Sequence, residues 1–236
     1  MANETNRQLD ATEIIRAITK LRQRIKERFP DRNLENVCAS LLAIAKDSKE
    51  KIEWINTPNI LLRIVVGLIV LAAILAFIAS LRVVDISMSE MHLLDVVTLL
   101  EAGMNDLVLI GAALFFLFTI ESRIKRNRSI KALNEIRSIA HVIDMHQLTK
   151  DPSVVNRSQP TKSSPERTLD AYQLCRYLDY CSEMFSLSGK VAALYAQHQP
   201  DGVVLATVNE IEELTTGFSR KVWQKIAMLN MLEFDD

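Results

Sequence analysis

The densest run of side chains able to do chemistry lies between residues 141 and 152, which read HVIDMHQLTKDP. Histidine and aspartate together are typical of a metal site or of a pH-sensing pair. On a helix, however, His141 and His146 lie about 140° apart, and Asp144 does not lie between them on one face. Zinc-binding helices place their ligands three or four residues apart. A metal site would need a broken helix or ligands from other chains. We therefore expect no metal ligand here, only a polar helix end, with a pH sensor as the alternative.

Other candidate motifs are weaker. Ser188-Gly189-Lys190 lacks the upstream glycine of a phosphate-binding loop. A carboxylate cluster, formed by Glu210, Glu212 and Glu213, is typical of a solvated helix face. No dinucleotide-binding turn, nucleophile elbow or Cys-x-x-Cys pair occurs in the sequence. We expect no catalytic residue, no cofactor and no enzyme activity.

Cysteines and aromatic residues favour packing over chemistry. The three cysteines, Cys38, Cys175 and Cys181, are odd in number, and the last two have no common metal or redox spacing. We expect free thiols buried as small apolar groups. Four tyrosines (Tyr172, Tyr177, Tyr180 and Tyr195) fall within one helical segment and predict core or interface contacts. A net charge of -1 excludes a globally basic surface, so no nucleic-acid partner is expected.

Two apolar stretches dominate the chain and predict a hairpin in a membrane. The first, residues 64–81, carries no charge and is close to the roughly 20 residues needed to cross a bilayer. Thr57 and Pro58 supply a start signal, and Trp54 suits the interface. The uncharged core of the second stretch, residues 107–120, is shorter, so a buried soluble helix is its rival. We assign transmembrane helices to residues 57–82 and 104–122.

Charge predicts the orientation of this hairpin. Basic residues favour the cytoplasmic side, and they gather after the second stretch, at Arg123, Lys125, Arg126, Arg128 and Lys131. Between the stretches the balance is acidic, with Arg82 against five carboxylates. We expect a multi-pass protein of the plasma or bacterial inner membrane with both termini in the cytoplasm. The basic run is a topology signal, and it would also attract anionic lipid.

The acidic loop and its border hold the polar groups nearest the membrane. Residues 83–103 are expected outside, with a short amphipathic helix that begins at a Ser87–Glu90 capping box; a re-entrant pore helix is the alternative. Asn105 and Asp106 lie at the outer edge of the second span. In a symmetric oligomer Asp106 would form an acidic ring at a pore mouth. The simpler interpretation places it in headgroup water.

The remaining sequence predicts long helices, because glycine and proline are sparse and fall between periodic segments. Residues 1–56 form a helical hairpin (11–29 and 33–56), with Asp10 and Glu13 as a capping box. One helix continues from 104 to 148, so residues 123–148 extend the second span. Residues 149–167 form a linker, and 168–236 a second hairpin, whose first helix is capped at Ser164-Pro165 and whose last runs over 203–232. The fold class is all-α, a membrane hairpin with a cytoplasmic bundle or coiled-coil-like domain.

Apolar stripes on these helices predict assembly. Helices this long seldom bury their stripes in a small monomer, so neighbouring subunits are expected to complete the packing. Ala72, Ala76 and Ser80 form a row that allows close helix approach, as do Gly111 and its alanine neighbours. The sequence therefore predicts a membrane scaffold that self-associates and recruits or senses a cytoplasmic protein partner. A homo-oligomeric ion channel or membrane-perforating effector is the alternative. For a scaffold, polar substitution of Val208, Phe218 or Val222 should abolish assembly.

Overall fold

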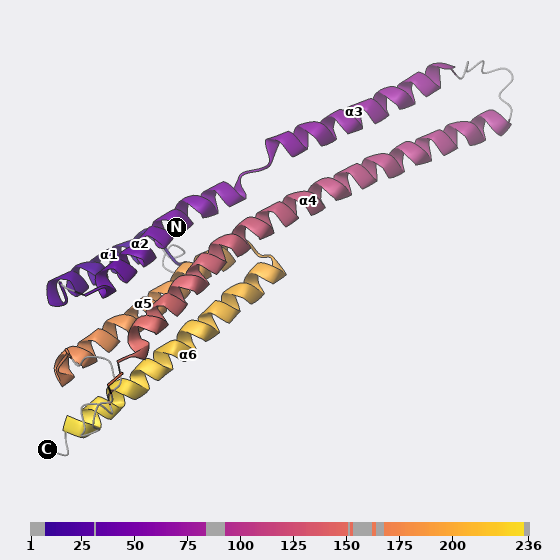
Figure 1. Cartoon of the computed structure of the whole chain (residues 1–236). Coiled ribbons are helices and arrows are strands. Elements are labelled where there is room, and N and C mark those ends of the chain that lie inside the picture. The colour runs from indigo at the N-terminus through magenta and orange to yellow at the C-terminus, as the bar shows by residue number, and fades with distance from the viewer. Residues whose placement is uncertain are drawn as a thin grey trace. The chain divides into compact units, whose positions relative to one another are not determined.

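Six α-helices make up the part of the chain that the structure describes (Figure 1). The computed structural model describes residues 8–30, 32–83, 93–150, 152, 162–163 and 168–233. The helices are α1 (Ala11–Arg28), α2 (Leu34–Asn56), α3 (Ile60–Val83), α4 (Leu93–Leu148), α5 (Ala171–His198) and α6 (Gly202–Glu233). No strand occurs among the described residues, which confirms the all-α prediction. The chain divides into an apolar unit, residues 57–127, and a bundle unit, residues 1–56 with 128–236.

Local sequence explains where the bundle helices begin. The Asp10 carboxylate accepts a hydrogen bond from the Thr12 backbone N–H at 2.7 Å and caps α1. The expected capping box with Glu13 is wrong, since Glu13 pairs instead with Arg16 at 2.5 Å. At α5, Asp170 and Gln173 form a reciprocal capping box. The predicted cap at Ser164-Pro165 is therefore misplaced, and those two residues lie outside the described ones.

Two helices of the apolar unit begin elsewhere than the sequence predicted. Asn59, not Thr57, precedes the first turn of α3: its carbonyl accepts from the Arg63 backbone N–H at 3.1 Å and its side chain from Leu62 at 3.5 Å. Helix α4 starts at Leu93, within the stretch assigned to a loop with its own short helix, and ends at Leu148 as predicted. A single glycine such as Gly103 costs a helix about 1 kcal/mol and does not end it. The Ser87–Glu90 box lies outside the described residues.

The bundle unit is built around α5. This helix packs against α1, α2 and α6. Buried side chains recur along it from Leu174 to Tyr195. Side chains of α4 complete the bundle. The Ser129 hydroxyl donates a hydrogen bond to Gln199, which caps the C-terminus of α5, and Glu135 pairs with Lys51 of α2 at 2.6 Å. Residues from both ends of the sequence thus share one hydrophobic core.

The apolar stripes that predicted subunit packing lie inside this core. Leu133, Ile136 and Ile143 of α4 are fully buried, and so are most stripe positions of α6. The α6 members are Val204, Val208, Ile211, Phe218, Val222, Ile226 and Leu229. One chain therefore satisfies its own stripes, and the premise that they need a second subunit is wrong. Self-association itself stays a prediction.

The apolar unit has the opposite character. Many of its large apolar side chains are exposed in the chain's own fold, and Leu61, Leu107 and Phe118 are about 70 % exposed. Two helices are long and apolar enough to cross a membrane, by length and composition. On α3 the buried positions are Val66 and Ala73, whereas Ala72 and Ala76 of the predicted small-residue row are exposed. The side chain of Ser80, the third member of the row, lies outside the described ones, so close helix approach along the row stays a prediction.

Candidate functional site

A polar cluster closes the C-terminal end of α4, inside the run that the sequence singled out. We call Asp144, Gln147, Lys150, Tyr177 and Lys225 the α4-end cluster. The Lys225 ammonium donates to the Gln147 backbone carbonyl at 2.8 Å and to its side-chain oxygen at 2.7 Å. Gln147 in turn donates to Asp144 at 2.6 Å. The cluster joins α4, α5 and α6 through polar contacts.

Lys225 compensates for the end of a helix. The last four carbonyls of a helix lack intrahelical partners and carry partial negative charge. Gln147 lies one residue before the end of α4 and is only 1 % exposed, so water does not satisfy it. The Gln147 carbonyl accepts one hydrogen bond from the Lys150 backbone N–H at 3.0 Å, and the Lys225 ammonium of α6 supplies a second, charged donor. One signal of this role was present in the sequence, since Lys225 lies between the apolar stripe positions Val222 and Ile226.

Lys150 and Tyr177 form the second half of the cluster. The Lys150 ammonium lies 5.5 Å from the Tyr177 ring centroid, and burial, helped by the charge of Arg32, lowers the pKa of Lys150. The Tyr177 hydroxyl donates to the His146 carbonyl at 3.4 Å. Burial raises the pKa of Tyr177 and that of the fully buried Cys181. Both groups stay protonated at neutral pH, which suits structural roles.

The two histidines of the run do not converge. His141 packs edge-to-face against Phe218 with ring centroids 5.5 Å apart, while His146 contributes its carbonyl to Tyr177. Asp144 is engaged by Gln147. Across the described residues, no three His, Cys, Asp or Glu side chains are grouped so that they could hold a metal ion.

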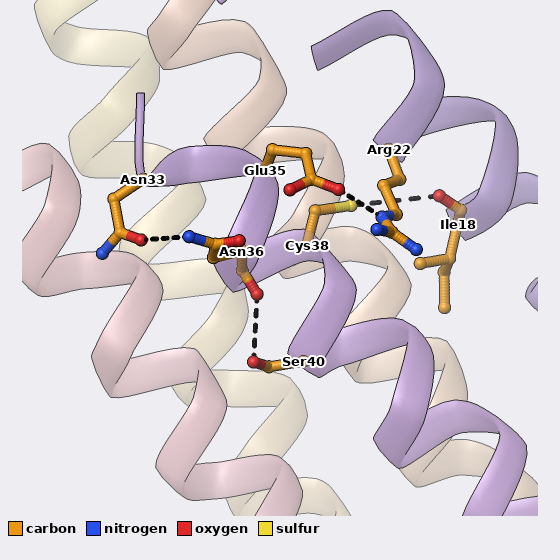
Figure 2. Close-up of polar contacts among 7 residues, drawn as sticks. All are labelled: Ile18, Arg22, Asn33, Glu35, Asn36, Cys38 and Ser40. Carbon is orange, nitrogen blue, oxygen red and sulfur yellow. Dashed lines mark hydrogen bonds and ion pairs between the residues drawn. The ribbon is translucent and has the colours of Figure 1, made fainter. Parts of the chain in front are cut away.

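The cysteines are placed for packing. No disulfide joins them; Cys38 and Cys181 are buried and Cys175 is half-buried. Figure 2 shows Cys38 between α1 and α2, where its sulfur lies 3.9 Å from the Ile18 carbonyl oxygen. Nearby, the Arg22 guanidinium pairs with Glu35 at 2.5 Å and ties the two helices together (Figure 2). Burial raises the pKa of Cys38 to about 12. Such a thiol carries almost no thiolate at neutral pH and is a poor nucleophile.

The tyrosines and the Ser188-Gly189-Lys190 motif also have packing roles. Phe29 packs edge-to-face against Tyr177 and Tyr180, with ring centroids 5.7 and 6.2 Å apart. Helix α5 continues through Gly189 without a break. A Cβ atom at Gly189 would lie 3.3 Å from the Thr215 hydroxyl oxygen, so the glycine permits close approach of α5 and α6. The motif holds no phosphate loop.

The remaining candidates are the carboxylates of α6 and, in the apolar unit, Asp106 of α4. Glu210 pairs with Arg137 of α4, whereas Glu212 and Glu213 are exposed. Asp106 is half-exposed on α4 between the exposed Asn105 and Leu107.

One contact was missed by sequence reasoning. The Arg128 guanidinium of α4 lies 3.7 Å from the ring centroid of Trp54 of α2. Trp54 was expected at the membrane interface, and Arg128 was expected as one of five cations that set the topology. Because 73 positions separate the two in sequence, periodicity could not pair them.

The chain matches no family model, no curated protein and no solved structure in the comparisons made. The geometry must therefore support the functional argument alone. It offers a packed helical bundle, an exposed apolar unit and polar contacts that fasten helix ends.

Proposed function

We propose that this chain is an integral membrane scaffold: a two-span hairpin that anchors a self-associating cytoplasmic helical bundle able to recruit a partner. The proposal assigns the membrane to the apolar unit and the cytoplasm to the bundle unit. It includes no catalytic step.

The observation that carries the proposal is the shared core of the bundle unit. Helices α1 and α2 precede the apolar unit in sequence and α5 and α6 follow it, yet α5 packs against α1 and α2. Arg24 of α1 pairs with Glu183 of α5, and Leu9 exchanges hydrogen bonds with Gln197. Segments that fold together must lie on the same side of a membrane, so the chain between them crosses an even number of times. Two crossings fit that requirement.

Exposure supports the membrane assignment. Apolar side chains such as Leu68, Phe115 and Phe116 are more than 60 % exposed in the apolar unit. Soluble monomers rarely expose so large a contiguous apolar surface, because contact with water costs about 25 cal/mol per Å². A lipid environment removes that cost. The basic run after the second span favours the cytoplasmic orientation.

Self-association is supported by side chains that the bundle leaves uncovered. Trp223 and Met231 of α6 are 59 % and 69 % exposed, although the buried stripe of the same helix faces the core. Exposed tryptophan and methionine are enriched where protein surfaces meet. The interface of the proposed oligomer is therefore assigned to the outer face of α6 in place of the stripe.

Two measurements test the proposal. Carbonate extraction of membranes from cells that express the full chain should leave the protein in the pellet. In intact cells, added protease should digest tags at both termini only after the membrane is opened. Release into the supernatant, or protection of one terminus alone, would refute the hairpin.

The mass of the detergent-solubilised protein tests the scaffold. A discrete oligomer is expected that Trp223→Glu disrupts and the matched control Lys221→Glu does not. A monomer would remove self-association from the proposal. Ion flux in liposomes, changed in selectivity by Asp106→Asn, would replace the scaffold with the channel alternative.

A further inference from the structure

Trp54 and Arg128 form a stacked pair at the edge of the bundle unit. Their separation of 3.7 Å, from guanidinium carbon to ring centroid, is close for a cation–π contact. Trp54 remains 53 % exposed. Stacking occupies the flat face of the guanidinium and leaves its N–H groups, which lie in the plane, available to an acceptor.

Arg128 differs from the other arginines and lysines that join bundle helices. Lys51 pairs with Glu135, Arg22 with Glu35 and Arg137 with Glu210. Within the described ranges, no carboxylate pairs with Arg128, and none pairs with Lys131, which follows it by three residues on α4. Two cations beside an exposed indole therefore lack a carboxylate partner of their own among the described residues.

The position in the chain indicates what the acceptor is. Trp54 precedes the apolar unit by three residues, and Arg128 is the first residue after it. Eight residues of helix separate Arg128 from Ile120, or about 12 Å at 1.5 Å per residue. The headgroup layer extends about 5–8 Å beyond the hydrocarbon. A long basic side chain that reaches back toward the membrane meets lipid phosphates at that depth.

From these observations, and resting on the membrane placement proposed above, we propose that Trp54, Arg128 and Lys131 form a binding site for the headgroup of an anionic phospholipid. The indole ring holds the guanidinium in orientation, Arg128 donates to the phosphate, Lys131 adds positive charge farther along α4, and the ring contacts the interface where tryptophan is favoured. Lys125, one turn earlier, is engaged by Glu121 at 3.1 Å and adds less net charge.

Native mass spectrometry of the full chain in detergent tests this site, with phosphatidylglycerol and phosphatidylcholine added in equal amounts. The wild-type protein should retain phosphatidylglycerol in preference. Arg128→Gln should weaken that retention about fivefold, because one cation near the surface contributes about 1 kcal/mol. Trp54→Ala leaves the charge unchanged and should weaken it as well. Arg137→Gln is the matched control and should behave as wild type, since Arg137 is paired with Glu210.

Three outcomes would overturn the site: equal retention of both lipids by wild type, equal losses in the Arg128 and Arg137 variants, or an unchanged Trp54→Ala variant. Melting curves of each variant exclude unfolding as the cause of a loss. The failure of the membrane placement is a separate result, because a chain that purifies from the soluble fraction without detergent refutes the scaffold itself. A chain that requires detergent yet does not discriminate between the lipids refutes only this site.

Discussion

Replacing Lys225 with methionine should destabilise the bundle by removing the donor that caps α4. Lys225→Met keeps the aliphatic length and deletes two charge-assisted hydrogen bonds to Gln147, at 2.8 and 2.7 Å. Each such bond contributes about 1.5–3 kcal/mol, and the helix terminus adds up to about 1 kcal/mol. Release of the half-buried ammonium from its environment offsets part of this loss. We expect a net loss of about 2 kcal/mol, or about 4–8 °C in melting temperature for a domain of this size.

The assay is thermal unfolding of the full chain in nanodiscs, followed by circular dichroism, with hydrogen exchange read at the last turn of α4. Lys221→Met is the matched control on the same helix. Lys221 is exposed, and among the described residues its ammonium makes a cation–π contact with the Phe218 ring, 5.3 Å from the ring centroid. The control should stay within about 0.5 kcal/mol of wild type. If the two variants unfold at the same temperature, or if α4 exchange is unchanged, the capping argument is refuted.

Three further outcomes are expected. Gly217→Ala should raise stability by about 0.5–1 kcal/mol in urea titration, because a Cβ there meets nothing within 4 Å, whereas Gly189→Val should lower it by about 1–3 kcal/mol through overpacking; matching signs would contradict the packing described. At pH 8 a maleimide should label the half-buried Cys175 and spare Cys38, whose pKa is raised to about 12. The free energy of unfolding should fall as pH rises from about 9 to 12, because the Cys38 thiol loses its proton at lower pH in the unfolded chain than in the folded one. Val208→Asp should lower the free energy of unfolding of the bundle by about 3–5 kcal/mol, because it buries a charge. Circular dichroism should then show loss of helix, whereas a change of mass with unchanged helix content would indicate dissociation of subunits alone.

Helix identity and most helix ends were predictable from the sequence. The termini of α1, α2 and α6 fall within one or two residues of the predicted ones, because Asp10, Pro30 and the turn at residues 200–202 are strong local signals. The start of α5 was missed since Asp170 and Gln173 compete with a serine-proline pair that has the same signature. Local signals of equal strength cannot be ranked without the packing around them.

Tertiary pairing was less predictable. The stripe on α6 was identified correctly, but its partner was expected in another subunit, because a stripe records that a face is buried and not what covers it. The Trp54–Arg128 pair and the Lys225 cap both join residues more than 70 positions apart. Neither leaves a periodic trace. The run at residues 141–152 was singled out for its histidines, whereas the short hydrogen bonds within it are those that Gln147 makes with Asp144 and Lys225.

The divided bundle has a consequence for biosynthesis. The α1–α2 hairpin leaves the ribosome first, with Ile18, Leu21 and Leu41 ready for a core whose central helix, α5, is still untranslated. At about 5–20 residues per second, α5 follows only after roughly 6 to 28 seconds. The apolar unit, for which we propose two membrane spans, is synthesised during that interval. The nascent α1–α2 hairpin therefore remains incompletely packed, with exposed apolar surface, until α5 is synthesised. Chains truncated before α5 should be substrates for chaperones and proteases, not partly functional products.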